Sequence, residues 1–226
     1  MIPFQNPDIF IGSLRIQEPI TVLTDLLIVT VCVFAFIKTT ATKHVGVNLY
    51  RWFFLATGIS TFVSAIIGHA FLYQWDINAK IYGWVAGIIS IGVGQYAALY
   101  HTRAVIGEKT FHILRWLNSI EILLALIFVF VVFSFNVVEV HSAIGLLLTI
   151  TVLEYINYKH TQSVISKYMM IGVAVSVLAV LCHILKLAIS VWFNHLDLSH
   201  VIIAIAVYLM YKGVSLYQRN TNKYAI

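Results

Sequence analysis

Hydrophobic residues run along this chain in long blocks, which short polar stretches separate. A helix that spans a membrane needs about 20 mostly apolar residues. Seven segments meet this requirement: 18–38, 48–73, 79–101, 113–135, 139–158, 168–193 and 199–217. Residues 1–17 are too short and too mixed to span. The pattern therefore predicts an all-α fold, an integral membrane bundle of seven transmembrane helices.

Composition supports this assignment. Of the 226 residues, 61% are hydrophobic and 10% are charged, and a soluble domain of this size cannot hide so much apolar surface. We predict an extracytoplasmic N-terminal segment (1–17), a membrane domain (18–217) and a cytoplasmic tail (218–226). The N-terminus lacks a basic region followed by an apolar one, so no cleavable signal peptide is expected.

The basic residues predict an orientation. Eleven of them fall in the loops after spans 1, 3 and 5 or at the C-terminal end: Lys38, Lys43, Arg51, Arg103, Lys109, Arg115, Lys159, Lys167, Lys212, Arg219 and Lys223. The opposite side holds only Arg15 and Lys80. The positive-inside rule then places the N-terminus outside and the C-terminus in the cytoplasm. Because the net charge of +5 is spread over several loops, we expect no nucleic-acid partner. The high Ile content favours a bacterial plasma membrane.

Polar side chains inside the spans are costly in lipid, so each needs a partner, a cavity or a function. The predicted orientation puts most of them in the outer half. They are Glu18, Thr21 and Asp25 on one face of span 1, His69 with Asp76 in span 2, His183, Lys186, Ser190 and Asn194 along span 6, and His195, Asp197 and His200 at the start of span 7. Helical spacing predicts that spans 1, 2, 6 and 7 bring these groups together in one layer.

Each of these residues also has a purely structural interpretation. His183 can hydrogen-bond in the helix packing, and Lys186 can extend to the outer interface. Asp76, Asn194 and His195 can be solvated loop residues. Four helices with polar faces at one depth are harder to explain in this way, and the combination favours a site.

The chain resembles the CREST superfamily in three features. It has a His late in span 2, an Asp after that His, and a span-7 sequence that runs from Asp197-Leu-Ser-His200 to Gly213-Val-Ser-Leu. That group includes the alkaline ceramidases and the progestin and adiponectin receptors. The opening Glu18-Pro-Ile-Thr-Val-Leu-Thr-Asp25, with Trp192-Phe-Asn194, is closer to a group of uncharacterised bacterial seven-span proteins. Most of the chain resembles the superfamily by topology, and only a few residues do so by motif.

The resemblance implies a zinc ion near one membrane face. It makes His69 and His200 ligands, with Asp76 or Asp25 as the assisting carboxylate. The chain departs from the superfamily pattern at two positions, because Leu196 stands where a second span-7 His is expected and Ala65 where a Ser is expected. A third ligand is left to His195, Asp197 or His183, since catalytic zinc commonly has three protein ligands.

The resemblance, together with these residues, implies a zinc-dependent hydrolase that cleaves a lipid amide or ester at the outer leaflet. Asp25 or Asp76 would serve as base or orient a ligand, and Lys186 or Ser190 would stabilise an oxyanion. The alternative is a receptor, sensor or small-ligand binder that uses the same polar pocket without hydrolysis, and the broken His pair favours it. A transporter is disfavoured because no span is interrupted by Pro and no internal repeat is evident. A retinal protein is disfavoured because span 7 has no Lys near its middle.

Overall fold

The computed structural model describes residues 6–223, and it is an all-α bundle. Residues 1–5 of the predicted N-terminal segment and 224–226 of the predicted tail lie outside the described residues. Seven helices in the described range are long and apolar enough to span a membrane, as expected of an integral membrane protein. Their elements are α1 (Pro19–Lys38), α2 (Val45–Val63) with η1 (Ser64–Ala70), α3 (Lys80–Ile106), α4 (Glu108–Val132), α5 (Phe135–Ala143) with η4 (Ile144–Ile150) and α6 (Thr151–Thr161), α7 (Val164–Ile184) and α8 (His195–Lys223).

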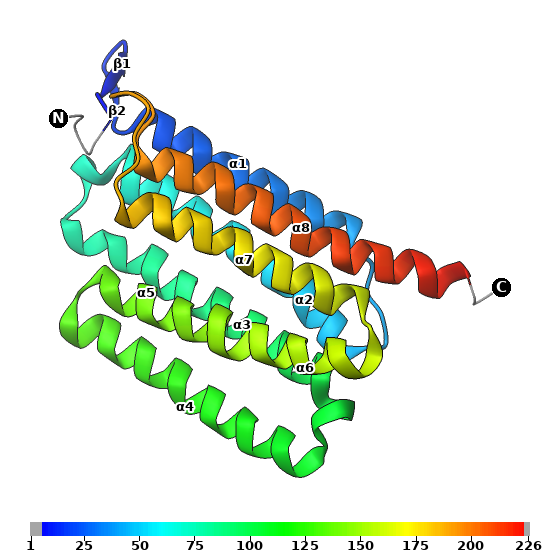
Figure 1. Ribbon diagram of the computed structural model, residues 1–226. Coiled ribbons are helices and arrows are strands. Elements are labelled where there is room, and N and C mark those ends of the chain that lie inside the picture. Colours follow the sequence, from blue (N-terminus) through cyan, green and yellow to red (C-terminus); the bar gives the residue numbers. More distant parts are fainter. Residues whose placement is uncertain (1–5, 224–226) are drawn as a thin grey trace.

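Small elements gather at one end of the bundle. A hairpin of β1 (Ile9–Ile11) and β2 (Leu14–Ile16) precedes α1, and the 3₁₀ turns η2 (Leu72–Gln74) and η3 (Ile77–Ala79) join η1 to α3. We call this end, where α1, α3, α5 and α8 begin, the N-terminal end. The opposite end, where α1, α3, α6 and α8 finish, is the C-terminal end (Figure 1).

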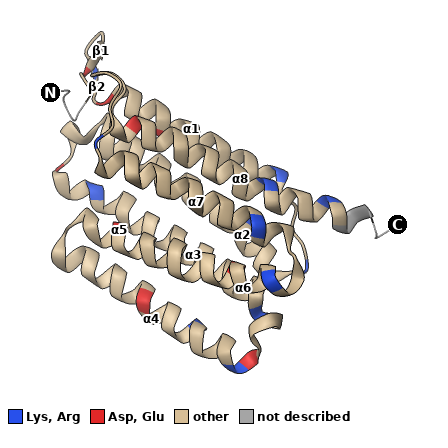
Figure 2. Ribbon diagram, in the orientation of Figure 1, with Lys and Arg blue, Asp and Glu red and all other residues tan. Residues whose placement is uncertain are grey.

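α3 runs through the middle of the bundle and packs on α2, α4, α5 and α6 (Figure 1). α7 packs along α8, which also contacts α1. α4 lies at the outer edge, and it exposes large apolar side chains such as Trp116, Phe130 and Val131. Charged residues are few and lie mostly toward the ends, with Lys and Arg gathered at the C-terminal end (Figure 2). An apolar belt between polar ends is the surface that a bilayer requires.

Two spans contain π-helical turns that the sequence pattern did not predict. η1 follows α2 and contains His69, and η4 interrupts the span from α5 to α6. A π-helical turn shifts the phase of the residues after it and often occurs at functional sites. The span-2 residues beyond Val63 therefore do not follow the regular helical phase expected over 48–73.

Span 6 is shorter than predicted, and its expected continuation to residue 193 is wrong. α7 ends at Ile184, and Lys186 takes a left-handed conformation with φ 51°. The backbone N–H groups of Leu185 and Leu187 bond back to Leu181 and Cys182, which satisfies the last carbonyls of the helix. Apolar residues continue through Phe193, so composition alone hides this end. The helix of span 7 is longer than predicted, since α8 continues beyond residue 217 to Lys223.

Gly46 lets the start of α2 approach α3 closely. A Cβ atom at this position would lie 2.5 Å from the backbone nitrogen of His101 and 2.7 Å from its Cα. Both atoms belong to a helix backbone, so the clash cannot be relieved by a side-chain rotation.

Replacing Gly46 with Ala is therefore expected to destabilise the protein by about 1–3 kcal/mol, the usual cost of overpacking a filled interior. Thermal unfolding in detergent measures this loss. Gly68→Ala is the matched control, since nothing lies within 4 Å of a Cβ built there. Equal melting temperatures for the two variants would contradict the close α2–α3 contact.

Candidate functional site

Three predicted residues lie together near the N-terminal end of the bundle: Asp25 from α1, His69 from η1 and His200 from α8. We call them the Asp25 centre. Nδ1 of His200 lies 3.3 Å from Oδ1 of Asp25. Nε2 of His69 lies 4.0 Å from Oδ2 of the same carboxylate, and the two imidazole centroids are 6.5 Å apart. The structure thus brings together the carboxylate and the two histidines that the sequence singles out in spans 1, 2 and 7.

Glu18 fixes the ring of His69 from the opposite side. Its carboxylate bonds Nδ1 of His69, and its backbone is left-handed with φ 44° at the start of α1. The neighbouring backbone is held in place, because the N–H of Gln17 donates to the carbonyl of Ala70 at 3.0 Å and the Gln17 side chain accepts from the N–H of Tyr73 at 2.9 Å. This arrangement leaves Nε2 of His69 facing Asp25.

Asp25 carries a buried oxygen without a partner. Oδ1 faces His200, whose Nδ1 also lies 3.2 Å from the hydroxyl of Thr24, whereas Oδ2 has no hydrogen-bond partner among the described residues. An unsatisfied carboxylate oxygen is costly in a buried site. A proton, a cation or a polar ligand would remove that cost.

The side chains of the Asp25 centre are not positioned as a complete set of metal ligands. Within residues 6–223, no group of three or more His, Cys, Asp or Glu side chains is arranged to hold a metal ion as it stands. The donor types still suit zinc, since His nitrogen and Asp oxygen are both common ligands. Two atoms bound to one tetrahedral zinc ion lie roughly 3–3.5 Å apart, so the His200–Asp25 pair fits and His69 needs a small rotation.

Asp197, a candidate third ligand, has another role in the structure. It is fully buried, and its Oδ1 accepts from the Thr21 hydroxyl at 2.8 Å. Its Oδ2 accepts from the Asn6 amide at 3.1 Å and from the backbone N–H of Asn194 at 2.7 Å. Asp197 therefore joins the N-terminal segment, α1 and α8, and we call these four residues the Asp197 clasp.

Replacing Asp197 with Ala is expected to lower the free energy of unfolding by about 1–3 kcal/mol, because three donors lose their acceptor in a buried place. Metal affinity of the folded variant should stay near that of the wild type, since the clasp holds no ion. Thermal unfolding and zinc titration in detergent test the two statements. Asp76→Ala is the control. A complete loss of zinc binding in a well-folded Asp197→Ala protein would restore Asp197 as a ligand.

Asp76, Ser190 and Lys186 lie in the connections between helices. The carboxylate of Asp76 caps η3 by accepting from the N–H of Asn78 at 3.0 Å, and it is exposed. Ser190 shapes the α7–α8 loop, where its hydroxyl accepts from two backbone N–H groups. Lys186 lies exposed in the same loop, because α7 ends before it. The predicted polar stripe along span 6 is thus broken.

His183 and His195 form a separate pair. Their ring centroids are 5.1 Å apart, and His183 also approaches Glu139 at 4.0 Å. His195 begins α8, one turn before Ser199, whose hydroxyl donates to its carbonyl. The two rings lie at the α7–α8 junction, beside the Asp25 centre rather than around its carboxylate.

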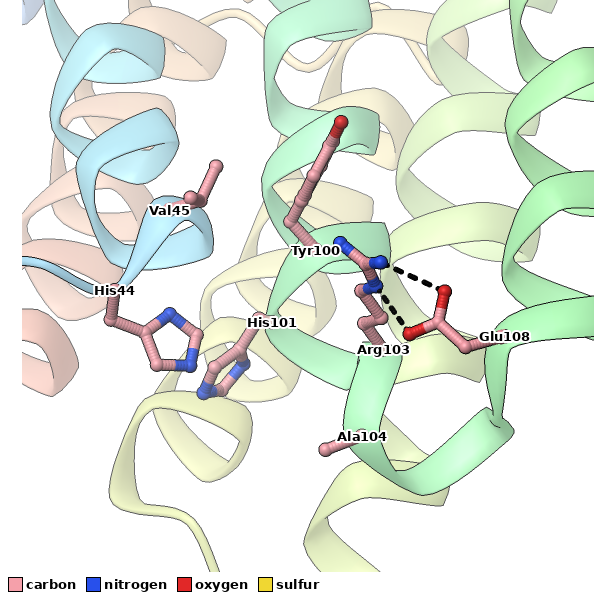
Figure 3. Close-up of a pocket in the computed structure, with 7 residues that line it drawn as sticks. All are labelled: His44, Val45, Tyr100, His101, Arg103, Ala104 and Glu108. Carbon is pink, nitrogen blue, oxygen red and sulfur yellow. Dashed lines mark hydrogen bonds and ion pairs between the residues drawn. The ribbon is translucent and has the colours of Figure 1, made fainter.

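A second buried polar network lies at the C-terminal end, for which the sequence analysis predicts no chemistry. Glu154 is fully buried and contacts His101, Tyr50 and Ser166. His101 forms part of the wall of a cavity of about 290 Å³, together with His44, Val45, Tyr100, Arg103, Ala104 and Glu108 (Figure 3). Desolvation at the cavity wall and the neighbouring His101 ring lower the pKa of His44. No linear motif links these residues, which come from separate spans.

A family model described as a family of unknown function, DUF6962, matches residues 20–219. The chain belongs to this family. The matched range contains Asp25, His69 and His200, and it also contains His101 and Glu154, so both polar centres of this DUF6962 member lie within the family domain. The chain has no significant match among curated proteins or among solved structures.

Proposed function

We propose that this DUF6962 protein is a metal-dependent hydrolase of membrane lipids, with Asp25, His69 and His200 as the ligands of a zinc ion. The observation that carries the proposal is the buried carboxylate of Asp25, whose Oδ1 faces His200 and whose Oδ2 faces His69 without a hydrogen-bond partner among the described residues. Three protein ligands leave one position of a tetrahedral ion open, which is the arrangement of catalytic zinc.

The surroundings of His69 also support a metal ligand. Ligand histidines nearly always donate their other ring N–H to a carboxylate or carbonyl, which fixes the ring and raises its basicity. Glu18 is such a carboxylate for His69, and the hydrogen bond from the N–H of Gln17 to the carbonyl of Ala70 fixes the backbone next to it. In His200, Nδ1 is the nitrogen that faces Asp25, so it is the atom that would bind the ion. When bound, zinc lowers the pKa of a coordinated water toward about 7 and polarises a carbonyl.

The depth of the site suits a lipid linkage. Asp25 lies six residues after Pro19, so it is about 9 Å below the start of α1. Ester and amide linkages of lipids lie at this interfacial level, between the headgroups and the hydrocarbon. The outward face of α1 is apolar, with Leu23 and Leu27 exposed, so a lipid can approach from the side. With the N-terminus outside, as the basic residues predict, the substrate would come from the outer leaflet of a bacterial plasma membrane.

The roles of the protein groups follow from their contacts. Asp25 and the two histidines would hold the ion, Glu18 sets the orientation of the His69 ring, and the Asp197 clasp fixes α1 against α8. The proposal also draws on the resemblance to the CREST superfamily, which rests on a histidine late in span 2 and one early in span 7. Neither Asp76 nor Ser190 contacts the centre, so we give them no part in the chemistry.

The experiment is a lipid hydrolysis assay on purified protein in nanodiscs. Ceramide and phosphatidylcholine serve as amide and ester substrates, and mass spectrometry measures released fatty acid. We expect release that stops on treatment with a zinc chelator and returns on adding zinc, with Asp76→Asn and Ser190→Ala retaining activity. Zinc-loaded protein that binds lipid without releasing fatty acid would reject the hydrolase and leave the receptor or sensor.

A further inference from the structure

Glu154 anchors an imidazole at the C-terminal end of the bundle. The buried carboxylate accepts from the hydroxyl of Ser166 at 2.5 Å and from Nδ1 of His101 at 2.9 Å, and it also bonds the hydroxyl of Tyr50. When Nδ1 of His101 donates to this carboxylate, the lone pair of the ring is on Nε2.

Ser163 lies on the Nε2 side of that ring. Its hydroxyl oxygen is 3.5 Å from Nε2 of His101, at the long end of hydrogen-bond reach. The amide nitrogen of Asn157 lies at the same distance from Nε2 and also donates to Ser166 at 3.0 Å. A serine, an imidazole and a carboxylate in this order form the nucleophile, base and orienting group of acyl transfer, and such contacts are often longer without substrate.

The backbone around Ser163 suits a nucleophile. Ser163 is half-buried and precedes α7, and Gln162 before it is left-handed with φ 54°. The first N–H groups of a helix have no partner within the helix, so they can stabilise an oxyanion next to the serine. His101 also lines the neighbouring cavity, with Tyr100 and the Arg103–Glu108 ion pair on the same wall (Figure 3).

We propose that Ser163, His101 and Glu154 form a serine esterase centre at the C-terminal end, separate from the Asp25 centre, that acts on carboxylic esters. In the first step the Ser163 oxygen bonds to the ester carbonyl carbon while its proton moves to Nε2 of His101. The bond from that carbon to the alcohol oxygen then breaks, and the alcohol leaves with this proton. Water attacks the acyl-serine by the reverse proton path and releases the carboxylic acid.

The same residues have a structural use, which the test must separate from catalysis. Ser163 caps α7, since its hydroxyl accepts from the N–H of Ser166 at 3.4 Å, and Glu154 ties together α2, α3, α6 and α7. A cap or a tie requires no reactivity. Covalent modification of Ser163 is therefore the decisive readout, because a structural role does not produce it.

The experiment treats the full-length wild-type protein in detergent with a fluorophosphonate probe, whose fluoride is displaced by an activated serine so that the serine is phosphonylated. Peptide mass spectrometry then locates the label, and p-nitrophenyl butyrate hydrolysis is followed in parallel. We expect the label on Ser163 and at least a 100-fold loss of both signals in Ser163→Asn, which keeps an N-cap side chain. Ser134→Ala is the matched control, because Ser134 caps α5 in the same way. It should label like the wild type.

Label on a different residue, or no label on folded wild-type protein, would overturn the proposal. Mapping the wild type needs no variant, so a misfolded Ser163→Asn protein does not leave the question open. The esterase centre and the metal centre fail independently. A zinc chelator and Asp25→Asn should leave the Ser163 label unchanged, whatever they do to lipid hydrolysis.

Discussion

Replacing Asp25 with Asn is expected to reduce zinc affinity and lipid hydrolysis by at least about 100-fold, more than the roughly 10–100-fold typical of changes in groups that only support a ligand. The carboxylate faces both imidazoles, and an amide offers one weaker oxygen without a charge. Zinc titration in detergent and fatty-acid release in nanodiscs measure the two losses.

Stability should change in the opposite direction. Oδ2 of Asp25 is buried without a partner, so a neutral side chain of the same shape lowers the cost of burial. We expect metal-free Asp25→Asn protein to melt at the same temperature as the metal-free wild type or higher. A structural carboxylate behaves differently, since its loss lowers the melting temperature. Lower stability together with unchanged zinc affinity would contradict the assignment.

Glu18→Gln tests whether a group that supports a ligand has a smaller effect on zinc affinity than the ligand itself. Glu18 touches only His69 in the centre, so it orients a ligand without being one. We expect zinc affinity to fall by about 10–100-fold, the range for second-layer carboxylates, which is less than for Asp25→Asn. Zinc titration of the two variants side by side gives the order. The reverse order would show that Glu18 is itself a ligand.

Replacing Glu154 with Ala is expected to destabilise the protein by about 3–5 kcal/mol, the cost of breaking a buried charged network on one side. The substitution leaves the donors of Tyr50, His101 and Ser166 without an acceptor at the junction of four helices. It also opens a void where the fully buried side chain stood. Chemical or thermal unfolding in detergent measures the loss.

Glu108→Ala is the matched control for this substitution. Glu108 forms a bidentate ion pair with Arg103 near the same end of the bundle, but its side chain is 63% exposed. Exposed pairs contribute little, so the melting temperature should not change. If Glu154→Ala and Glu108→Ala both have the melting temperature of the wild type, Glu154 does not stabilise the junction of the four helices.

The amino-acid pattern predicted the seven spans because apolar length is a strong signal in membrane helices. It also predicted that Asp25, His69 and His200 lie at the same end of the bundle. The direction in which each helix crosses the membrane sets the depth of every residue along it. The end of span 6 was predicted nine residues too late, from 193 to 184, because Val191-Trp192-Phe193 is as apolar in a loop as in a helix. The π-helical turn around His69 left no pattern in the sequence either.

The Asp197 clasp and the His101–Glu154 network depended on contacts between distant segments. Asn6 reaches Asp197 across 191 positions, and His101 reaches Glu154 across 53. Periodicity places residues on a face of one helix, but it does not say which helix that face meets. Glu154 and Asn157, three apart on one face of α6, were the available hint that this face packs against polar groups.

The metal content of the purified protein tests the central claim most directly. Wild-type protein is saturated with zinc, freed of loose metal by gel filtration and measured by elemental mass spectrometry, beside His69→Ala and His200→Ala. We predict close to one zinc ion per wild-type chain and a loss of most of it in both variants. Folded wild-type protein without zinc, or variants that keep it in full, would contradict a metal centre at Asp25, His69 and His200.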